Sequence, residues 1–236
     1  MKFESALIRG TLTRRYKRFL ADVTLEDGSE ITAHIANPGS MLGMAFPGDK
    51  IWLETNDDPK RKLKYSWKFI ETSTTLIGVD TSAANRIVKE ALQSHKIDLN
   101  YDSFKSEVKY GENSRVDFLL SKKNMPDTYL EVKSVTLSRK PGLAEFPDSK
   151  TIRGAKHMEE LANMVSQGYQ ATVLFLVQRT DALQVSVAGD IDLNYQRAFS
   201  LAVVAGVQVL CYDCIISNEG ITLGKRLDLA NTSNSV

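Results

Sequence analysis

The sequence predicts a two-domain α/β (α+β overall) protein in which a small β-barrel precedes a larger domain built around a mixed sheet. Short alternating strand segments fill the first eighty residues, the first helical periodicity follows them, and strands and helices then alternate to residue 216. The 236 residues are 42% hydrophobic, which is enough for two domains with separate cores. We place the boundary between Gly78 and Ser82, which gives domains at 1–80 and 81–236.

The strand segments of the first domain alternate apolar and polar residues, as half-buried strands do. They are FLADVTL (19–25), EITAHIA (30–36) and DKIWLET (49–55), and turn sequences such as EDGSE, NPGSMLG, FPGD and NDDPK separate them. Strands this short and closely spaced suit a small barrel, for which the OB-fold is the natural candidate.

The second domain is expected to begin with a helix, TSAANRIVKEALQS, that Thr81 or Ser82 caps. Three strands follow, SFKSEVKY, RVDFLL and TYLEVKSV, and then an amphipathic helix from Ser149 to Gln167. ATVLFLVQ is apolar throughout, as expected of a strand covered on both faces. A helix, DLNYQRAFSLAVVA, and a buried strand, VQVLCYDCII, complete the domain, and disorder is expected from Asn231 onward.

The composition narrows the function classes. The net charge is only +1, so any affinity for nucleic acid must come from local patches. The first residues lack the apolar core of a signal peptide, no segment approaches a membrane span, and two cysteines make no disulfide framework. These features predict a cytoplasmic protein without a membrane partner, and the pattern does not address the oligomeric state. The cysteines of CYDC lie in an expected strand, which favours buried thiols over a zinc or redox site.

Three ionisable residues fall in neighbouring apolar strands: Asp117, Glu131 and Lys133. Glu131 and Lys133 share one face because residues i and i+2 of a strand point the same way, and a hairpin would add Asp117. Two carboxylates about 4 Å apart repel by roughly 4 kcal/mol at an effective dielectric near 20, and a bound divalent cation removes that repulsion. Oxygen ligands select Mg²⁺ or Mn²⁺ over zinc. A cation held there can promote phosphodiester hydrolysis, with Lys133 orienting water or offsetting charge in the transition state.

Other residues are expected to support this site. Glu90, on the preceding helix, is expected to be an outer metal ligand, and Glu107 on the first strand is a second candidate. Arg153, Lys156 and His157 share one helix side and are expected to contact phosphates. The competing interpretations are a cross-strand salt bridge for the acidic cluster and a solvated helix face for the basic one.

Two basic, aromatic stretches in the first domain predict nucleic-acid binding. Cations that follow a phosphate backbone, with rings on which bases stack, are typical of single-strand binding by small barrels. The expected binding residues are Arg14, Arg15, Lys17, Arg18, Lys60, Arg61, Lys62, Lys64, Tyr65 and Trp67. Stacking tolerates any sequence, so largely sequence-independent binding is expected. The alternative is a solvated edge strand with Trp67 and Phe69 in the core.

Several segments together resemble the bacterial sugar fermentation stimulation protein (SfsA) family. They are RYKRFLADV, NPGSMLG, PKRKLKYSW, SEVKYGENSRVDFLL, YLEVKSVTL, FPDSKTIRGAKHMEEL and GVQVLCYDC, and they span nearly the whole chain in order. The resemblance implies an N-terminal OB-fold and a C-terminal domain like the PD-(D/E)xK restriction-endonuclease-like nucleases. Family members are described as DNA-binding proteins linked to sugar-utilisation genes, and as DNA or RNA nucleases.

By this resemblance, Asp117 matches the nuclease motif's aspartate, Glu131 and Lys133 its Glu-x-Lys, and Glu90 its outer helix acid. Two departures stand out: Ala155 replaces a glutamine of the RGQKH segment, which removes a secondary polar contact, and HIANPGS replaces HCPNTG. We therefore expect a DNA-binding protein with a Mg²⁺-dependent (or Mn²⁺-dependent) phosphodiesterase site acting on DNA or RNA. The alternatives are a non-catalytic DNA-binding regulator of sugar-utilisation (maltose-type) genes and a protein-interaction role with a purely structural triad.

Overall fold

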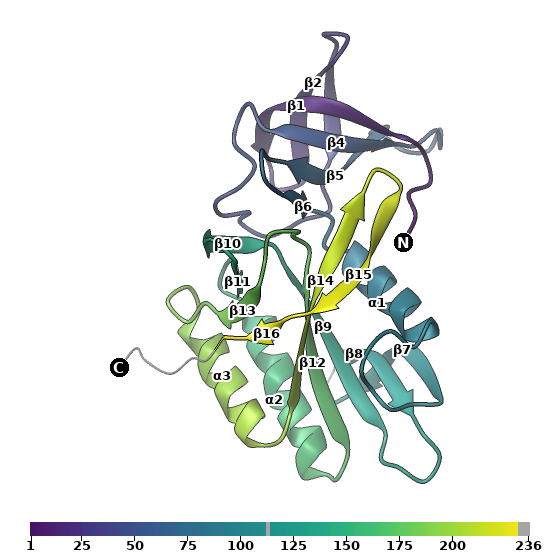
Figure 1. Ribbon diagram of the computed structural model, residues 1–236, viewed down its shortest axis with the longest axis vertical. Coiled ribbons are helices and arrows are strands. Elements are labelled where there is room, and N and C mark those ends of the chain that lie inside the picture. The colour runs from purple at the N-terminus through teal and green to yellow at the C-terminus, as the bar shows by residue number, and fades with distance from the viewer. Residues whose placement is uncertain (112–113, 231–236) are drawn as a thin grey trace.

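The computed structural model describes residues 1–111 and 114–230, so the disorder expected from Asn231 onward lies outside the described residues. Within them, the chain forms an N-terminal barrel at one end of a larger α/β domain (Figure 1). None of the helices in these residues combines the length and apolar character that a membrane span needs.

The barrel consists of five short strands, and a sixth leads out of it. The strands are β1 Leu7–Tyr16, β2 Leu20–Leu25, β3 Glu30–His34, β4 Lys50–Thr55, β5 Tyr65–Glu71 and β6 Leu76–Gly78. Strand β1 pairs antiparallel with β2 and β4, and a parallel pairing of β3 with β5 closes the ring. A closed five-stranded barrel with these pairings is an OB-like fold, which confirms the predicted fold of the N-terminal part.

The alternating pattern builds the barrel core because successive side chains of a strand point to opposite faces. On β4, Ile51 and Leu53 are fully buried while Lys50 is exposed. Trp67 and Ile70 of β5 fill the same core. Burial of each large apolar side chain stabilises the fold by roughly 1.5–3 kcal/mol.

A six-stranded mixed sheet forms the centre of the second domain, as predicted. Its order is β15-β14-β12-β9-β8-β7, parallel in the middle and antiparallel towards both edges. The strands are β7 Ser103–Tyr110, β8 Ser114–Ser121, β9 Thr128–Val135, β12 Gln170–Val177, β14 Gln208–Ser217 and β15 Gly220–Arg226.

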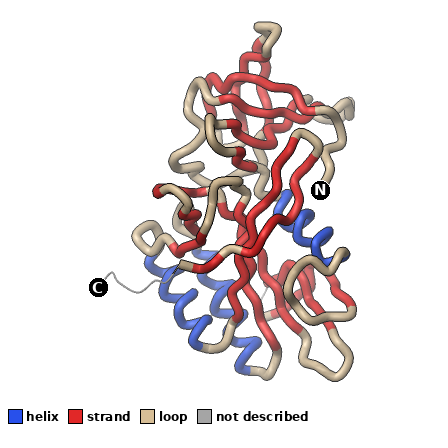
Figure 2. The backbone as a smooth tube through the Cα atoms, in the orientation of Figure 1, coloured by secondary structure: helices blue, strands red, loops and turns tan. Residues whose placement is uncertain are grey.

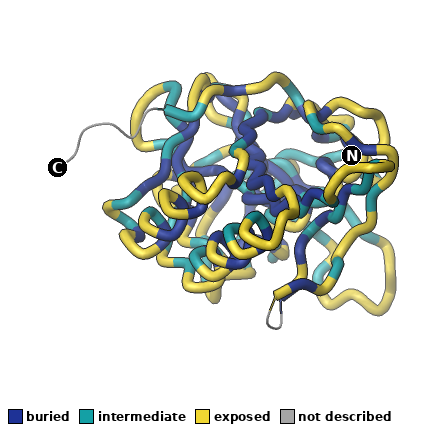
Figure 3. Tube along the Cα trace, turned by 90° about the horizontal axis from the view of Figure 1, so that it is seen from below, coloured by how far each residue is buried: buried dark blue, intermediate teal, exposed yellow. Residues whose placement is uncertain are grey.

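Helices cover both faces of this sheet (Figures 1 and 2). They are α1 Ala83–Gln93 on one face, and α2 Ile152–Ser166 with α3 Leu193–Val204 on the other. Adjacent residues of β12 serve the two layers, since Leu174 packs with the α1 side and Phe175 with the α2 and α3 side. The view from below shows buried segments inside and exposed helix turns outside (Figure 3).

Helix α2 begins later than the expected Ser149. The Thr151 side chain accepts a hydrogen bond from the Gly154 backbone N–H at 3.0 Å and caps the helix there. The residues before the cap contact the barrel instead, since Ser40 Oγ donates to the Asp148 carbonyl at 2.7 Å. Helix α2 therefore begins only after the residues that contact the barrel.

A small second sheet was not predicted. It has the order β10-β11-β13-β16, with β10 Leu137–Lys140, β11 Leu143–Phe146, β13 Gln184–Val187 and β16 Asp228–Leu229. Strands of two to four residues are too short to show a period, so the sequence pattern could not separate them from loops.

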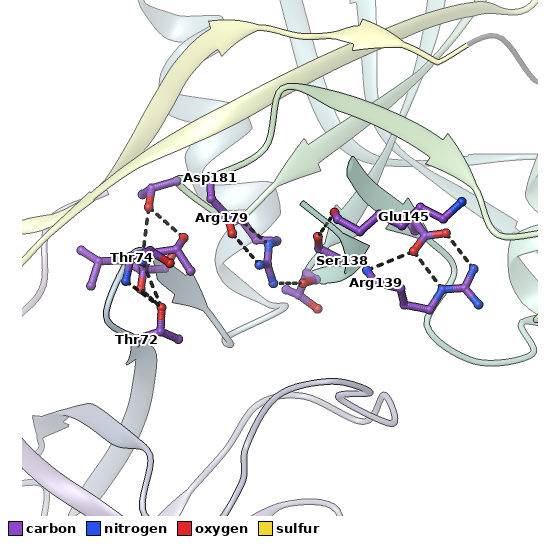
Figure 4. Close-up of polar contacts among 12 residues, drawn as sticks. Thr72, Thr74, Ser138, Arg139, Glu145, Arg179 and Asp181 are labelled. Atoms are coloured by element: carbon purple, nitrogen blue, oxygen red, sulfur yellow. Dashed lines mark hydrogen bonds and ion pairs between the residues drawn. The ribbon is translucent and has the colours of Figure 1, made fainter. Parts of the chain in front are cut away.

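Hydrogen bonds fix the barrel against the second domain. The Gly78 N–H donates to the Gln178 carbonyl at 2.8 Å, and Gln178 Nε2 donates to the Asp80 carbonyl at 3.3 Å. Beside this junction, Arg179 binds Asp181 through two hydrogen bonds of 2.9 and 2.8 Å (Figure 4). These contacts give the space between the domains a defined shape.

Candidate metal centre and nucleic-acid interface

The pairing of β8 with β9 brings Asp117 and Glu131 to equivalent positions. The ladder ends where Phe118 pairs with Leu130, and Asp117 and Glu131 are the next residues along the two strands. Instead of a backbone pair, Asp117 Oδ2 accepts from the Val132 N–H at 2.8 Å. Both carboxylates line one cavity of about 480 Å³, which we call the central cleft.

Asp117 is partly buried and held from two sides. Its Oδ1 accepts from Asn85 Nδ2 of α1 at 2.7 Å, in addition to the Val132 contact of Oδ2. Burial, and then the negative charge of Glu131, raise the pKa of Asp117 to about 6, although both hydrogen bonds oppose the rise. Asp117 therefore changes charge close to neutral pH.

Glu131 is only 3% exposed, and its two oxygens have different surroundings. Lys133 Nζ donates to Oε1 at 2.8 Å, and His157 Nδ1 contacts the same oxygen. Burial works against the charged form, but Lys133 and His157 hold the pKa of Glu131 below its ordinary value. Within the described residues, Oε2 is buried and has no hydrogen-bond partner. One oxygen is thus fixed by hydrogen bonds, and the other keeps its acceptor positions unused.

His157 is buried, whereas Arg153 and Lys156, which are predicted to share its helix side, are exposed. Arg153 Nε donates to His157 Nε2 at 3.2 Å, so Nδ1 of a neutral ring carries the proton. That proton points to Glu131 Oε1. His157 lies on the buried side of helix α2, which packs against the sheet.

Arg153 and Lys156 remain exposed beside the site, and Lys156 Nζ lies 3.6 Å from Glu160 Oε1. Ala155 is partly buried against the apolar core between the two.

Glu90 does not reach the central cleft, which corrects its prediction as a metal ligand. Its Oε2 pairs with the Met1 amino group at the far side of α1. The residue of α1 that contacts Asp117 is Asn85 and not Glu90. At 3.6 residues per turn, Asn85 lies about 140° around the helix from Glu90. Sequence analysis missed Asn85 because an asparagine early in a helix carries no pattern of its own.

Glu107 lines the central cleft opposite Asp117. The pairs on either side of it form, but residues 107 and 117 are left out of the ladder, and Glu107 takes a left-handed φ of 55°. A non-glycine residue pays about 1–3 kcal/mol for such a backbone, so the surrounding structure must hold it there.

The donor set fits a hard divalent cation. The described residues contain no group of three or more His, Cys, Asp or Glu side chains arranged around one metal. Mg²⁺ does not require such a group, since it usually keeps several waters and binds one or two carboxylates plus a substrate phosphate. Asp117 and the unpartnered Glu131 Oε2 supply those carboxylates.

The two basic stretches lie mainly in loops of the barrel, although Arg14 and Arg15 belong to the end of β1. Lys17 and Arg18 form the turn between β1 and β2, and the exposed cations from Lys60 to Lys64 lie in the loop between β4 and β5. In OB-folds these two loops, with the face of strands 2 and 3, form the nucleic-acid surface. Tyr65, at the start of β5, is partly buried.

Not every predicted binding residue is available to a ligand. Trp67 is 1% exposed in the barrel core, and its Nε1 donates to the Phe69 carbonyl at 3.1 Å. The prediction that bases stack on Trp67 is therefore wrong, since its ring cannot be reached in the folded barrel. Arg14 is paired with Asp22 at 2.8 Å, and Arg15 donates to the carbonyls of the 37–40 loop.

A second cavity, of about 780 Å³, joins the barrel to the central cleft. Arg15 and Arg18 line it on the barrel side, and Lys150 lines it on the other. It shares Lys133 and Thr151 with the central cleft. The basic β1–β2 turn and the acidic pair are thus connected by one continuous lining.

Two family models match the chain. The model described as the sugar fermentation stimulation protein RE domain matches residues 82–220, and the SfsA N-terminal OB domain matches residues 13–79. Among solved structures, that of Pyrococcus furiosus SfsA in complex with Ca²⁺ superposes with a TM-score of 0.82 at 22% identity, over 97% of both chains.

Sugar fermentation stimulation protein homologues resemble the chain over nearly its whole length. The Roseobacter denitrificans homologue is 55% identical over 225 residues, 94% of this chain and 96% of its own. The homologue of Ruegeria sp. strain TM1040 is 55% identical over 227 residues, 95% and 98% of the two chains. That of Pseudoalteromonas atlantica is 48% identical over 233 residues, 97% and 99% of the two chains.

Proposed function

The chain belongs to the sugar fermentation stimulation protein family, and from this premise we propose that it is a metal-dependent nuclease that binds DNA or RNA. In this proposal the barrel holds the nucleic acid, largely without regard to sequence, and the central cleft cleaves a phosphodiester bond. The proposal includes a cytoplasmic location, where bacterial cells keep both nucleic acids.

Asp117 and Glu131 are the proposed ligands of Mg²⁺ or Mn²⁺. The observation that carries the proposal is that two carboxylates from adjacent strands line one cavity while Glu131 Oε2 is buried without a partner. Leaving such an oxygen unsatisfied costs about 1–3 kcal/mol or more, which a cation would recover. The Ca²⁺ complex of Pyrococcus furiosus SfsA supports a hard-cation site in this fold.

When bound, the cation would polarise the scissile phosphate and lower the pKa of a coordinated water. Lys133, whose ammonium lies 2.8 Å from Glu131, is placed to orient the attacking water or to offset charge on the pentavalent transition state. Asp117 must be ionised to act as a ligand, and its pKa of about 6 puts the active form at neutral and alkaline pH.

His157 is the positioning residue of this site. Its Nδ1–H holds Glu131 Oε1 in place, so that Oε2 alone is presented for metal binding. Arg153 supports the ring from outside and, with the exposed Lys156, offers cations to the phosphate backbone at the edge of the cleft.

The β1–β2 turn and the β4–β5 loop of the barrel form the proposed nucleic-acid-binding surface. Counterion release from phosphates makes such binding strongly salt-dependent and nearly independent of sequence. The cations assigned to it are Lys17, Arg18, Lys60, Arg61, Lys62 and Lys64, with Tyr65 as the remaining aromatic contact, whereas Arg14 and Arg15 are already bonded within the barrel.

The test is cleavage of labelled single- and double-stranded DNA and RNA by the purified protein with Mg²⁺ or Mn²⁺. Asp117→Ala and Glu131→Ala should abolish cleavage and leave binding in EDTA intact. Glu90→Gln is the matched control, because this acid lies outside the cleft and should keep full activity. Cleavage that survives Asp117→Ala, or that needs no divalent cation, would overturn the proposal.

One observation favours a second candidate function, a non-catalytic DNA-binding regulator of sugar-utilisation genes on a nuclease-like scaffold. In the described part of the chain Asp117 and Glu131 do not belong to a group of three or more acidic, cysteine or histidine side chains placed to hold one metal, and Lys133 is already bonded to Glu131. This candidate predicts DNA binding that is indifferent to Mg²⁺ and to Glu131→Gln, with no product under any metal.

A further inference from the structure

Two exposed rings are stacked on the surface of the barrel. Phe19 ends the β1–β2 turn and His34 ends β3, and their ring centroids are 6.3 Å apart with planes 10° from parallel. Phe19 is 44% exposed, and His34 is exposed as well. Neither ring takes part in the proposed cleavage reaction, so this exposed, parallel pair is a candidate surface for a ligand.

His34 lies in the lining of a polar cavity of about 520 Å³, which we call the barrel cleft. Arg61, from the basic β4–β5 loop, and Arg86 of α1 line the same cleft. Two of its acids, Glu54 and Asp80, are paired with buried Lys68 at 2.9 and 3.3 Å, and Arg86 lies 3.6 Å from Asp80. The third acid, Glu4, is exposed, as is the further cation Lys2. The exposed cations therefore dominate the charge that a ligand meets in the barrel cleft.

The barrel cleft leads to the central cleft. Ser82, at the start of α1, lines both cavities, and Asn85 and Asp117 lie just beyond it in the central cleft. On the other side, Arg153 and His157 are shared with a further cavity, of about 650 Å³, that Arg115 also lines. The lining is thus continuous from His34, the ring on which Phe19 is stacked, past the acidic pair, to a second cationic end.

We infer that this path binds one unpaired strand of nucleic acid, with a base stacked on the Phe19–His34 pair and the backbone along Arg61 and Arg86. A base can stack on a protein ring only when its face is free, which a continuous duplex does not allow and a single strand does. The inference deepens the proposed function and rests on it for the cleavage step: the substrate class is single-stranded nucleic acid that enters across the barrel.

The test uses single-stranded DNA and RNA that carry the fluorescent base 2-aminopurine, bound to the full chain in EDTA so that no metal-dependent cleavage occurs. Stacking quenches this fluorophore. Phe19→Ala should remove the quenching and weaken binding of the strand about tenfold, while duplex binding stays unchanged. Phe19→Trp should restore both signals. The nucleic acid, DNA or RNA, whose affinity falls more on Phe19→Ala is the one that the path prefers.

Matched controls locate the effect. Phe46→Ala removes a ring that is 57% exposed, lies in the loop between β3 and β4 and does not belong to the Phe19–His34 pair, and it should change neither signal. Arg86→Ala should weaken strand binding severalfold, whereas Lys123→Ala, in the loop between β8 and β9, should not. Quenching and affinity that survive Phe19→Ala in a folded protein would overturn the inference. If the wild-type protein quenches the fluorescence as expected but cleaves no nucleic acid when Mg²⁺ or Mn²⁺ is added, only the proposed nuclease function is contradicted.

Discussion

The ammonium of Lys133 lies 2.8 Å from Glu131 Oε1, two residues earlier on the same strand, and both groups are buried. This pair is held within one strand, so its geometry follows from the two-residue period of β structure. The contact occupies one carboxylate oxygen and leaves Oε2 without a partner in the described residues. The same ion pair therefore stabilises strand β9 and determines which oxygen of Glu131 is available to a metal.

Lys133→Met should lower the free energy of unfolding by about 3 kcal/mol, because it leaves a buried carboxylate without its main counter-charge. Urea unfolding measures the change. Glu131→Gln combined with Lys133→Met should recover much of the loss, since no uncompensated charge then remains. Equal stability of the wild type and Lys133→Met would show that Glu131 does not depend on this ion pair.

In the absence of divalent cations, Asp117 should make the protein less stable as pH rises. The folded state raises its pKa from 3.8 to about 6 and so binds the proton more tightly than the unfolded chain. Its contribution is therefore complete below about pH 4 and is lost as pH rises through about 6. The loss should amount to about 3 kcal/mol, and Asp117→Asn should remove it.

Thermal melts of both proteins from pH 4 to 8 in EDTA measure this dependence. Asp22→Asn serves as a control, because hydrogen bonding from Arg14 lowers the pKa of Asp22 and gives the opposite direction. Identical pH profiles for the wild type and Asp117→Asn would contradict the assigned environment of Asp117.

Neutralising the β4–β5 loop should weaken nucleic-acid binding and its salt dependence together. Replacing Lys60, Arg61, Lys62 and Lys64 by glutamine removes exposed cations, and each lost contact to a single strand should reduce the slope of log K against log salt by about 0.7. Fluorescence anisotropy at several salt concentrations measures both quantities. An unchanged slope would show that this loop does not contact phosphates.

Trp67→Phe provides the complementary measurement. The ring is buried, and its Nε1 bond to the Phe69 carbonyl would be lost, so stability should fall by about 1–2 kcal/mol. Affinity of the folded protein for a single strand should not change. A selective loss of affinity would restore Trp67 as a stacking residue.

The sequence predicts the parts of the fold that have a clear period. Alternation in Ile51 and Leu53 marks a barrel strand, and the uninterrupted run around Phe175 marks a strand covered by helices on both faces. The two-residue spacing of Glu131 and Lys133 likewise fixes a shared face before any coordinates are known.

The remainder depends on tertiary contacts that no local pattern encodes. Trp67 lies among lysines in the sequence, yet its position on β5 points it into the core. Glu90 and Asn85 share one helix, and only packing on the sheet decides which of them meets Asp117. The short strands of the second sheet pair across distant segments, as Leu143 does with Gln184.

The most direct test of the account is the location of Mn²⁺ by anomalous scattering in crystals of the full chain. The account predicts a peak within coordination distance of Asp117 and of Glu131 Oε2, and its loss in Asp117→Asn. A peak bound by other residues, or a central cleft that stays without Mn²⁺ at saturating concentration, would contradict it.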